Sequence, residues 1–576
     1  MANNYTDHPE LRFEMNHPLM KRIVELKERG FAEKDAYDYA PIDFDDAMDN
    51  YDRVLDIVGE IAGTTIADNA EGVDLEGPHH VGDRVNYASG TDRNLDAMVK
   101  AGMNGMTMPR RYKGLNFPIT PYTMCAELVA ASDAGFGNIW SLQDCIETLY
   151  EFGDADQHAR FIPRVCEGET MSMDLTEPDA GSDLQSVMLK ATFDEENNCW
   201  RLNGVKRFIT NGCGEVLLVL ARTEEGTTDG RGLSCLLVEK GPWIKVRRLE
   251  NKLGIHGSPT CEMVFTEAPA KLIGQRKRGL ITYVMTLMNG ARMGIAAQGV
   301  GIGEAAYRAA RDYAASRKQF GATIDNLAPI REILATMSVE CQAARALTYY
   351  AAKNVDLETG LTRKFEKMKG SPEAPAVRTR MKLVGSFNKM LTPMAKYYGS
   401  EMSMRNAMSA ISVLGGSGYM KDYPVERYLR DSRITTIYEG TSQLQVVAAV
   451  AGVIGGLVKD VLVDIFGKAD WQGEHPRMTA LLADLDAAIE YAKGRADSHA
   501  YLELSARKLV DAGIALIVTA LFHQMSIKVS EKGKALLHWM MTEFPRVRAG
   551  LEQVRSGYAG SVEDFETLAP AVPVMG

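Results

Sequence analysis

The spacing of apolar residues predicts a helical region from about residue 44 to residue 168. Apolar side chains recur every three or four residues in "FDDAMDNYDRVLDIVGEIAG" (44–63) and in "PYTMCAELVAASDAGFGNIWSL" (121–142). This period is typical of helices that bury one face or most of their surface. The region is therefore expected to form an N-terminal helical domain.

The period changes after this region to short runs rich in β-branched and aromatic residues. The runs are "CWRLNGVKRFITNG" (199–212), "EVLLVLART" (215–223) and "CEMVFTEAP" (261–269). Clusters of Asn, Gly and Asp separate them, which predicts an antiparallel sheet or barrel. The "LNG" at 202–204 favours a hairpin turn.

Helical spacing returns at about residue 281 and persists almost to the end of the chain. A charged stretch with Pro and Gly, 358–380, is expected to be a surface connection between two helices. The order of helices, strands and helices favours an α+β chain over a βαβ one. The expected regions are a lead segment (1–43), an N-terminal helical domain (44–168), a middle antiparallel β domain (169–280), a C-terminal helical bundle (281–458) and an extra helical domain (459–576).

Composition and charge narrow the class of protein. The chain has 576 residues, 45% of them apolar and 24% charged, as expected for a globular protein with a large core. Its net charge of −11 disfavours binding to nucleic acid or to anionic membranes. The eight cysteines form no CxxC pair, which favours reduced thiols over disulfides or zinc.

Targeting signals are not expected at the start of the chain. Its first 30 residues contain acidic side chains and no apolar h-region, so secretory and transit peptides are disfavoured and a cytoplasmic location is expected. Apolar runs such as 446–458 are shorter than the ~20 residues that span a bilayer, so no integral membrane segment is expected.

Two common catalytic classes lack their sequence signatures. "GVGIGEAA" (299–306) has Glu304 where a dinucleotide loop needs its third glycine, and it lies within a helical pattern, so close helix packing is the better interpretation. The ten histidines show no metal-ligand spacing, and no Gly-x-Ser-x-Gly elbow occurs. A hydrolase or a metal enzyme is therefore disfavoured, and no metal is expected.

Three other stretches carry candidate chemistry. They are "MSMDLTEPDAGSDL" (171–184), "RKQFG" (317–321) and "LGGSGYMKDYPVERYLRDSRITTIYEGTSQLQ" (414–445). Taken singly, the first is a good turn and the second a basic helix end. Glu439 in the third could be no more than a favourable charge near a helix start. Their order and their fit to the helix–strand–helix layout favour a joint function.

Together these motifs resemble the acyl-CoA dehydrogenase family of flavoproteins, from about residue 45 to residue 455. The resemblance is closest to long members such as the methylmercaptopropionyl-CoA dehydrogenases, which share the "LTEP-x-AGSDL" start, the "KLGIHGSPTCEMVF" segment (252–265) and a C-terminal helical extension. It implies an FAD enzyme of fatty acid β-oxidation. Such an enzyme converts an acyl-CoA to the trans-2-enoyl-CoA and passes electrons to electron-transfer flavoprotein.

By the same resemblance, Glu439 is the catalytic base that removes the α-proton while the β-hydride goes to flavin N5. A carboxylate of pKa ~4.3 is too weak for this proton unless it is desolvated and the thioester carbonyl receives hydrogen bonds. Some members carry their base just before an arginine, but Ala291 stands there, before Arg292. This favours Glu439.

The resemblance also assigns binding residues. The FAD-binding positions are Met173, Leu175, Thr176, Ser182, Phe208, Thr210, Arg317, Phe320, Ser412, Gly415, Gly416, Thr441 and Gln443. The substrate-binding positions are Ser182, Thr260, Arg292, Tyr438 and Gly440. Arg317 and Phe320 are expected to reach the FAD of a neighbouring subunit. Phe208 stands where many members carry a tryptophan, and Ser412 where the family has a glutamine.

Two alternatives within the same fold stay open. An acyl-CoA oxidase shares the base and the FAD and differs in using oxygen. A DNA-associated flavoprotein would need a basic C-terminal region, whereas residues 451–576 contain 13 Lys and Arg against 16 Asp and Glu. The C-terminal block is expected to cover the surface through which shorter members form tetramers, which predicts a homodimer.

Overall fold

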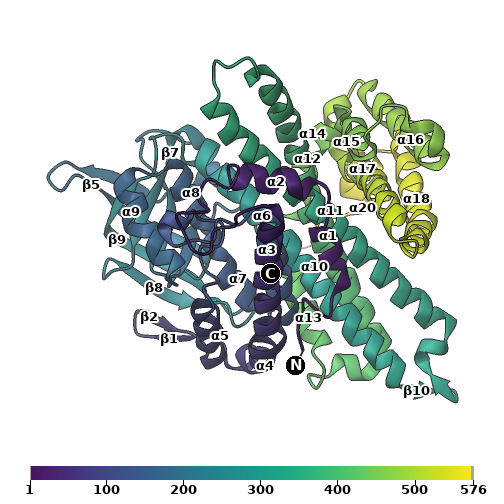
Figure 1. The fold of residues 1–576 in the computed structure, drawn as a ribbon, viewed down its shortest axis with the longest axis horizontal. Helices are drawn as coiled ribbons and strands as arrows, with labels where there is room; N and C mark the ends of the chain where they lie inside the picture. Colours follow the sequence, from purple (N-terminus) through teal and green to yellow (C-terminus); the bar gives the residue numbers. More distant parts are fainter. Residues whose placement is uncertain (1, 573–576) are drawn as a thin grey trace. The chain divides into compact units, whose positions relative to one another are not determined.

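The computed structural model describes residues 2–572, apart from the side chains at positions 286 and 289. The chain forms two compact units. The first consists of Met1–Val384 and Ala395–Thr441, and the second of Gly385–Met394 and Ser442–Gly576. Figure 1 follows the chain through both units by colour.

Helices precede the sheet in the first unit (Figure 1). They are α1 (Pro9–Met15), α2 (Leu19–Lys27), α3 (Phe44–Ile61), α4 (Ala67–Glu76), α5 (Ser89–Lys100), α6 (Ile119–Ser132), α7 (Ala134–Ser141), α8 (Cys145–Phe152) and α9 (Ala155–Cys166). Helix α3 begins after Asp43, whose side chain accepts a hydrogen bond from the Asp46 backbone N–H. Its residues Leu55 and Val58 are fully buried in one core with Leu128 of α6.

The middle of the first unit is a sheet with the strand order β3-β6-β4-β5-β9-β7, with β8 paired to β9. The strands are β3 (Met171–Asp174), β4 (Lys190–Asp194), β5 (Cys199–Thr210), β6 (Val216–Arg222), β7 (Leu233–Glu239), β8 (Ile244–Leu249) and β9 (Thr260–Leu272). A further pairing of β6 with β7 closes the sheet on itself. Most neighbours are antiparallel, and β3 runs parallel to β6. Two short hairpins, β1 (His79–Val81) with β2 (Arg84–Asn86) and β10 (Lys318–Gln319) with β11 (Ala322–Thr323), lie outside this sheet.

The hairpin turn expected at 202–204 is wrong. Strand β5 runs through this stretch, and its pairing with β9 shifts register between Leu202 and Gly204. Gly204 has φ +144°, and a Cβ there would lie 3.2 Å from Leu189. The glycine therefore allows a bulge within one strand, and the chain reverses instead at residues 195–198.

Long helices follow the sheet. They are α10 (Met285–Ser316), α11 (Ala328–Lys367), α12 (Ala374–Leu414) and α13 (Val425–Thr435). The connection expected over 358–380 is wrong in extent, because only residues 368–373 join α11 to α12. Close packing at "GVGIGEAA" is confirmed: a Cβ on Gly299 would lie 2.6 Å from the Gly399 carbonyl oxygen of α12.

The second unit is helical. With Gly385–Met394 of α12 it contains α14 (Ser442–Ile454), α15 (Leu457–Phe466), α16 (Pro476–Lys493), α17 (Ser498–Lys528), α18 (Lys532–Ser556), α19 (Gly560–Glu563) and α20 (Phe565–Leu568). Helix α17 is long and apolar enough to cross a membrane, and 72% of its most apolar window is buried in the structure. A helix that is apolar on all sides is typical of a bundle core.

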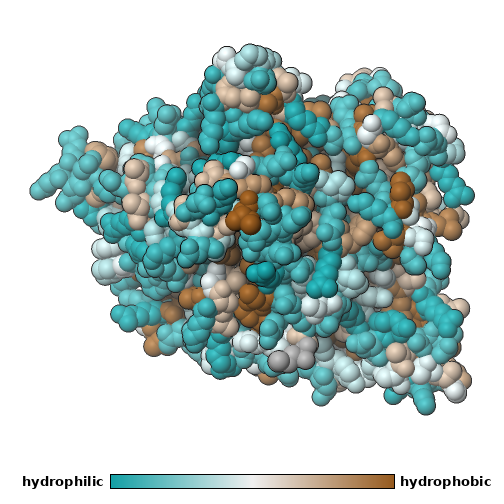
Figure 2. All heavy atoms as spheres, in the orientation of Figure 1, coloured by the Kyte–Doolittle hydropathy of each residue, from teal (hydrophilic) through white to brown (hydrophobic). Residues whose placement is uncertain are grey.

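The surface that Figure 2 shows is mostly polar. On the face drawn in Figure 2, hydrophilic side chains predominate and apolar ones form separate groups. All eight cysteines are free and buried. The expected α+β architecture, with helices before and after a middle sheet and further helices at the C-terminal end, is confirmed.

Candidate active site

Glu439 lies in a short turn after α13. The turn begins with hydrogen bonds from the backbone N–H groups of Ile437 and Tyr438 to the Ile434 carbonyl, at 2.9 and 3.1 Å. Glu439 then adopts φ +52°, and Gly440 φ +87°. A left-handed conformation at a residue other than glycine costs roughly 1–3 kcal/mol and persists only where neighbours hold it. The backbone conformation of Glu439 is therefore imposed by the surrounding structure.

Tyr438 anchors the turn on one side. Its phenol donates a hydrogen bond to Asn138 Oδ1 of α7 at 2.9 Å and also bonds Gln298 Oε1 of α10. The Gln298 amide in turn donates to the Ala134 carbonyl at 2.9 Å and to Asn138 Oδ1 at 2.8 Å. Burial raises the pKa of Tyr438, and the negative charge of Glu439 raises it further. The phenol thus stays protonated as a donor.

Lys396 anchors the turn on the other side. This residue of α12 is fully buried, and its Nζ donates a hydrogen bond to the Gly440 carbonyl oxygen at 2.7 Å. The sequence motifs did not predict it. The available signal was a single lysine within the apolar stretch "TPMAKYYG" (392–399), because a buried lysine needs a specific partner.

Two cations face the Glu439 carboxylate. Burial raises the pKa of Glu439, while the positive charges of Lys396 and Arg292 act in the opposite direction. Arg292 lies on α10 with only 8% of its surface exposed. A half-buried carboxylate with a raised pKa is suited to general base catalysis, because its basicity is then closer to working pH.

Predicted cofactor residues meet at the end of β3 and along β5. The Thr176 carbonyl accepts a hydrogen bond from the Arg207 backbone N–H at 3.0 Å, which joins the turn after β3 to β5. Phe208 follows with φ +63°, and its side chain is 51% exposed beneath the Arg207 guanidinium, 4.6 Å from the ring centroid. Thr210 is the register partner of Thr260 on β9. These predicted positions therefore share one edge of the sheet, by which we mean the C-terminal ends of β3 and β5 together with the start of β9.

A buried ion pair supports this edge. Lys206 is fully buried, and its Nζ donates to the Leu175 carbonyl at 2.8 Å and to Glu177 Oε1 at 2.9 Å. The Glu177 carboxylate also accepts the backbone N–H groups of Met188 and Leu189, at 2.7 and 2.9 Å. The "TEPDAGSD" turn is thereby fixed in place. Of the other predicted residues, Met173 is half-buried on β3 and Ser182 is exposed on the turn.

A second group of predicted residues surrounds the end of α10 and the end of α12. Gly415 and Gly416 follow α12; Gly415 has φ +61°, and a Cβ on either would meet nothing within 4 Å. The Tyr313 hydroxyl donates to Ser417 Oγ at 3.2 Å and so ties this glycine turn to the last turns of α10. Ser412 is exposed, and its hydroxyl donates to the Met408 carbonyl of its own helix at 3.1 Å.

Arg317 and Phe320 belong to the same second group. Arg317 is exposed directly after α10, and Phe320 is 91% exposed with φ +53° at the tip of the β10–β11 hairpin. Figure 1 shows β10 on the opposite side of the first unit from β5. Thr441 ends the first unit, and Gln443 is exposed on α14 of the second.

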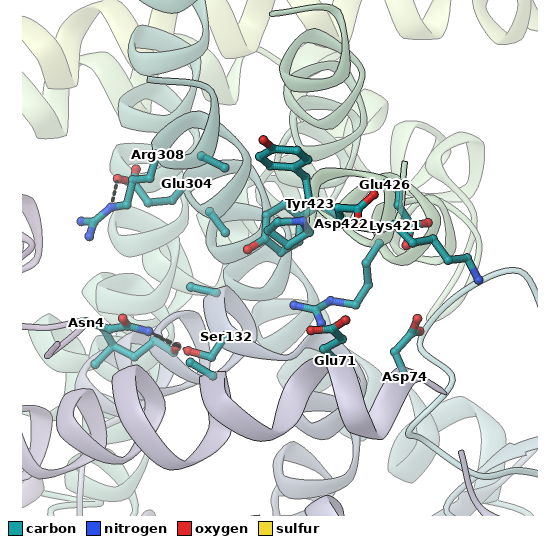
Figure 3. A pocket seen from close by; sticks show the side chains of 18 of the residues that line it. Asn4, Glu71, Asp74, Ser132, Glu304, Arg308, Lys421, Asp422, Tyr423 and Glu426 are labelled. Carbon is teal, nitrogen blue, oxygen red and sulfur yellow. Dashed lines mark hydrogen bonds and ion pairs between the residues drawn. The ribbon is translucent and has the colours of Figure 1, made fainter. Parts of the chain in front are cut away.

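A cavity of about 460 Å³ lies elsewhere in the first unit (Figure 3). Charged residues from the chain start, α4, α6, α10 and the α13 region line it, among them Glu71, Asp74, Glu304 and Arg308. Figure 3 shows Arg308 paired with Glu304 on one wall. None of the predicted site residues lines this cavity, so the cavity and the candidate active site are distinct.

Three family models match consecutive parts of the chain. They are the N-terminal domain of acyl-CoA dehydrogenase over residues 52–169, the middle domain over 172–268 and the C-terminal domain over 278–453. The chain belongs to the acyl-CoA dehydrogenase family. The expected enzyme class is thus confirmed, whereas the role of each individual residue stays a prediction.

Individual relatives agree with the family models. An acyl-CoA dehydrogenase of Bacillus subtilis is 36% identical over 373 residues, which cover 63% of this chain and 89% of the relative. The structure of butyryl-CoA dehydrogenase from Megasphaera elsdenii is 28% identical and covers 70% of this chain and 98% of its own, with a TM-score of 0.60. An acyl-CoA dehydrogenase from Bacillus anthracis, solved in complex with FAD, is 20% identical with a TM-score of 0.70; it covers 89% of this chain and 90% of its own, which shows a shared fold.

Proposed function

We propose that this protein is an FAD-dependent acyl-CoA dehydrogenase in which Glu439 removes the α-proton of an acyl-CoA thioester. The observation that carries the proposal is the Glu439 turn. Its carboxylate is partly desolvated, has a raised pKa, and is held in a left-handed turn between Tyr438, which bonds Asn138, and the buried Lys396. A carboxylate in this state is a stronger base than one in water.

FAD is the cofactor that the site residues fit. The exposed Phe208 ring lies on the strand whose Arg207 N–H bonds the Thr176 carbonyl, and an isoalloxazine ring would stack on this phenyl ring with the Thr176 hydroxyl as a hydrogen-bond partner. Gly415 and Gly416 leave open space where a side chain would stand, which suits close approach of a pyrophosphate to the backbone. When bound, FAD supplies the acceptor for the β-hydride.

The residues of this chain supply the proton transfer and the carbonyl donors. The backbone N–H of Glu439 donates to the thioester carbonyl, which stabilises the negative charge that develops on its oxygen. The Glu439 carboxylate takes the α-proton. Because only the ionised carboxylate can act, activity falls as the pH drops through the raised pKa of Glu439.

The second group of predicted residues acts on a neighbouring subunit in this proposal. Arg317 and Phe320 are exposed, and a Cβ on Gly415 or Gly416 would meet nothing within 4 Å, so these positions leave room for a ligand held by another subunit. A guanidinium pairs well with a pyrophosphate. We therefore assign these residues to the FAD of the partner in a homodimer, with the C-terminal helices covering the surface through which shorter members form tetramers.

Electron-transfer flavoprotein is the proposed electron acceptor. A solved structure whose title names an electron-transferring flavoprotein of Acidaminococcus fermentans is 30% identical to this chain and covers 96% of its own length.

The "KLGIHGSPTCEMVF" segment and the C-terminal helices support a place among the long members of the family that include the methylmercaptopropionyl-CoA dehydrogenases.

Anaerobic mixing of the purified protein with a panel of acyl-CoA thioesters tests the function. A dehydrogenase should lose its oxidised-flavin absorbance with at least one thioester. A protein that carries no flavin, or one that no thioester of the panel reduces, contradicts the proposal. Oxygen consumption without an added electron acceptor would identify an oxidase instead.

A further inference from the structure

We propose that Lys396 is a positioning residue for catalysis: its ammonium group, bonded to the Gly440 carbonyl, holds the Glu439 carboxylate in its reactive orientation and balances its charge. This inference rests on the proposed function, because it assigns Lys396 to the base of that reaction.

The geometry provides the first argument. Glu439 stands between two residues that are each fixed to another helix, Tyr438 to α7 and α10, and Gly440 to α12 through Lys396. Both residues of the pair Glu439–Gly440 have positive φ. The Gly440 carbonyl is therefore part of a conformation that L-residues avoid, and the lysine bond is a direct restraint on it.

The choice of partner provides the second argument. Two other fully buried lysines lie within salt-bridge distance of carboxylates: Lys353 of Glu14 at 2.5 Å, and Lys206 of Glu177 at 2.9 Å. Lys206 donates to the Leu175 carbonyl as well, but the main-chain carbonyl that Lys396 bonds lies in the turn that carries the base. Burying an ammonium group costs free energy of desolvation. We therefore expect a buried ammonium group in contact with the turn of the base to act on that base.

The charges around Lys396 provide the third argument. The charged groups that shift the pKa of the Lys396 ammonium group are Glu439, Arg292 of α10 and Glu401 of its own helix. Burial lowers the pKa of Lys396 to about 7, Glu439 and Glu401 raise it, and Arg292 lowers it. The protonated lysine favours the ionised form of Glu439, so it keeps the base active at a lower pH than burial alone would allow.

The test compares Lys396→Met, Lys396→Gln and Lys353→Met. The methionine removes both the donor and the charge, whereas the glutamine keeps a donor without a charge. Lys353→Met is the matched control, because it removes an equally buried lysine from α11. For each protein, the FAD content, the thermal unfolding, the acyl-CoA affinity and the limiting rate of anaerobic flavin reduction are measured between pH 5 and 9.

Lys396→Met should keep FAD and acyl-CoA affinity while its limiting rate falls roughly 10- to 100-fold, as expected for a displaced catalytic group. The acid limb of its pH profile should move up by about one unit, because a nearby cation is lost. Lys396→Gln should reduce flavin faster than Lys396→Met, because it keeps a hydrogen-bond donor. The acid limb of its pH profile should be shifted as in Lys396→Met, because the charge is absent from both. Lys353→Met should lose stability with an unshifted profile.

Two results would overturn the inference. One is a Lys396→Met enzyme with the rate and pH profile of the wild type. The other is loss of FAD or of folding in both Lys396 variants beyond that of Lys353→Met, which would make Lys396 a structural residue. The wild-type protein separates these results from failure of the proposed function, since that failure would leave the wild-type flavin oxidised in the presence of every thioester.

Discussion

The Thr176 carbonyl accepts a hydrogen bond from the Arg207 backbone N–H at 3.0 Å. This one bond joins two motifs that lie 31 positions apart, because Thr176 belongs to "TEPDAGSD" and Arg207 to "RFITNG". It places the Thr176 backbone next to that of Phe208, on the edge where the cofactor is proposed to lie.

Replacing Glu439 by glutamine should remove the base without removing the binding site. The amide has almost the same shape and cannot accept the proton, so the rate of flavin reduction should fall by about 10²- to 10⁴-fold or more. The FAD content and the acyl-CoA affinity should change little. Glu552→Gln, at an exposed position of α18, is the control. Near-normal turnover of Glu439→Gln would move the base elsewhere.

The pH profile of flavin reduction should have an acid limb above the usual range of a glutamate. Burial raises the pKa of Glu439, so the base becomes protonated and inactive at a higher pH than a solvated glutamate would. Stopped-flow reduction from pH 4.5 to 8 measures the limb. A rate that stays constant down to pH 4.5 would show that the carboxylate is solvated.

Replacing Tyr438 by phenylalanine should weaken both stability and catalysis. The substitution removes the phenol that bonds the Gln298 amide oxygen, whereas Asn138 Oδ1 keeps its bond from the Gln298 N–H, and an unsatisfied buried polar group costs about 1–3 kcal/mol. Denaturant unfolding measures the loss in the free energy of unfolding. The same change at exposed Tyr558 should leave stability within about 0.5 kcal/mol of wild type. Equal stability of the two variants would contradict the anchoring role of Tyr438.

Replacing Asp174 by asparagine should stabilise the protein at neutral and alkaline pH. Burial raises the pKa of Asp174 to about 7, although the Ser172 hydroxyl donates to its carboxyl group at 2.7 Å. The folded state thus holds this proton more tightly than the unfolded state, and the wild type loses stability as the pH rises from about 4 to about 7. The difference in Tm between Asp174→Asn and wild type should grow over this range and then level off. A difference that does not depend on pH would argue against a raised pKa.

Mixed dimers test whether two chains share one site. Arg317→Ala alone should bind FAD weakly, and Glu439→Gln alone should be inactive. If Arg317 serves the partner's cofactor, co-expression of the two variants creates a heterodimer in which one site has both wild-type residues, and activity should return. If Arg317 and Glu439 served the same site of one chain, every site would carry a defect and the mixture would stay inactive.

The architecture could be predicted because period and motif agree over long stretches. The helical period over 44–168 and the β-rich runs around 199–269 correspond to helices and strands in the structure. The predictions were wrong where the local composition favoured a turn or a loop but the folded chain continued as a strand or a helix. The glycine of "LNG" allows a bulge instead of a turn, and the charged residues of 358–367 face solvent while continuing α11.

The site could be predicted only where a contiguous motif marked it. Glu439 and Phe208 stand within recognisable stretches, whereas Lys396 lies 43 positions before Glu439 in a helix without a motif. Its bond to the Gly440 carbonyl depends on how α12 passes the turn after α13. Neither this bond nor the positive φ of Glu439 follows from the local sequence.

The division of α12 has a practical consequence. The second unit takes ten residues, Gly385–Met394, from within that helix, and the chain returns to it after Thr441. Two of the three junctions, after Met394 and after Thr441, therefore fall within three residues of Lys396 and of Glu439, respectively. A protein truncated after residue 441 would therefore not consist of the first unit alone. Its residues Gly385–Met394 would lack the rest of the second unit, and its new C-terminus would lie two residues after Glu439.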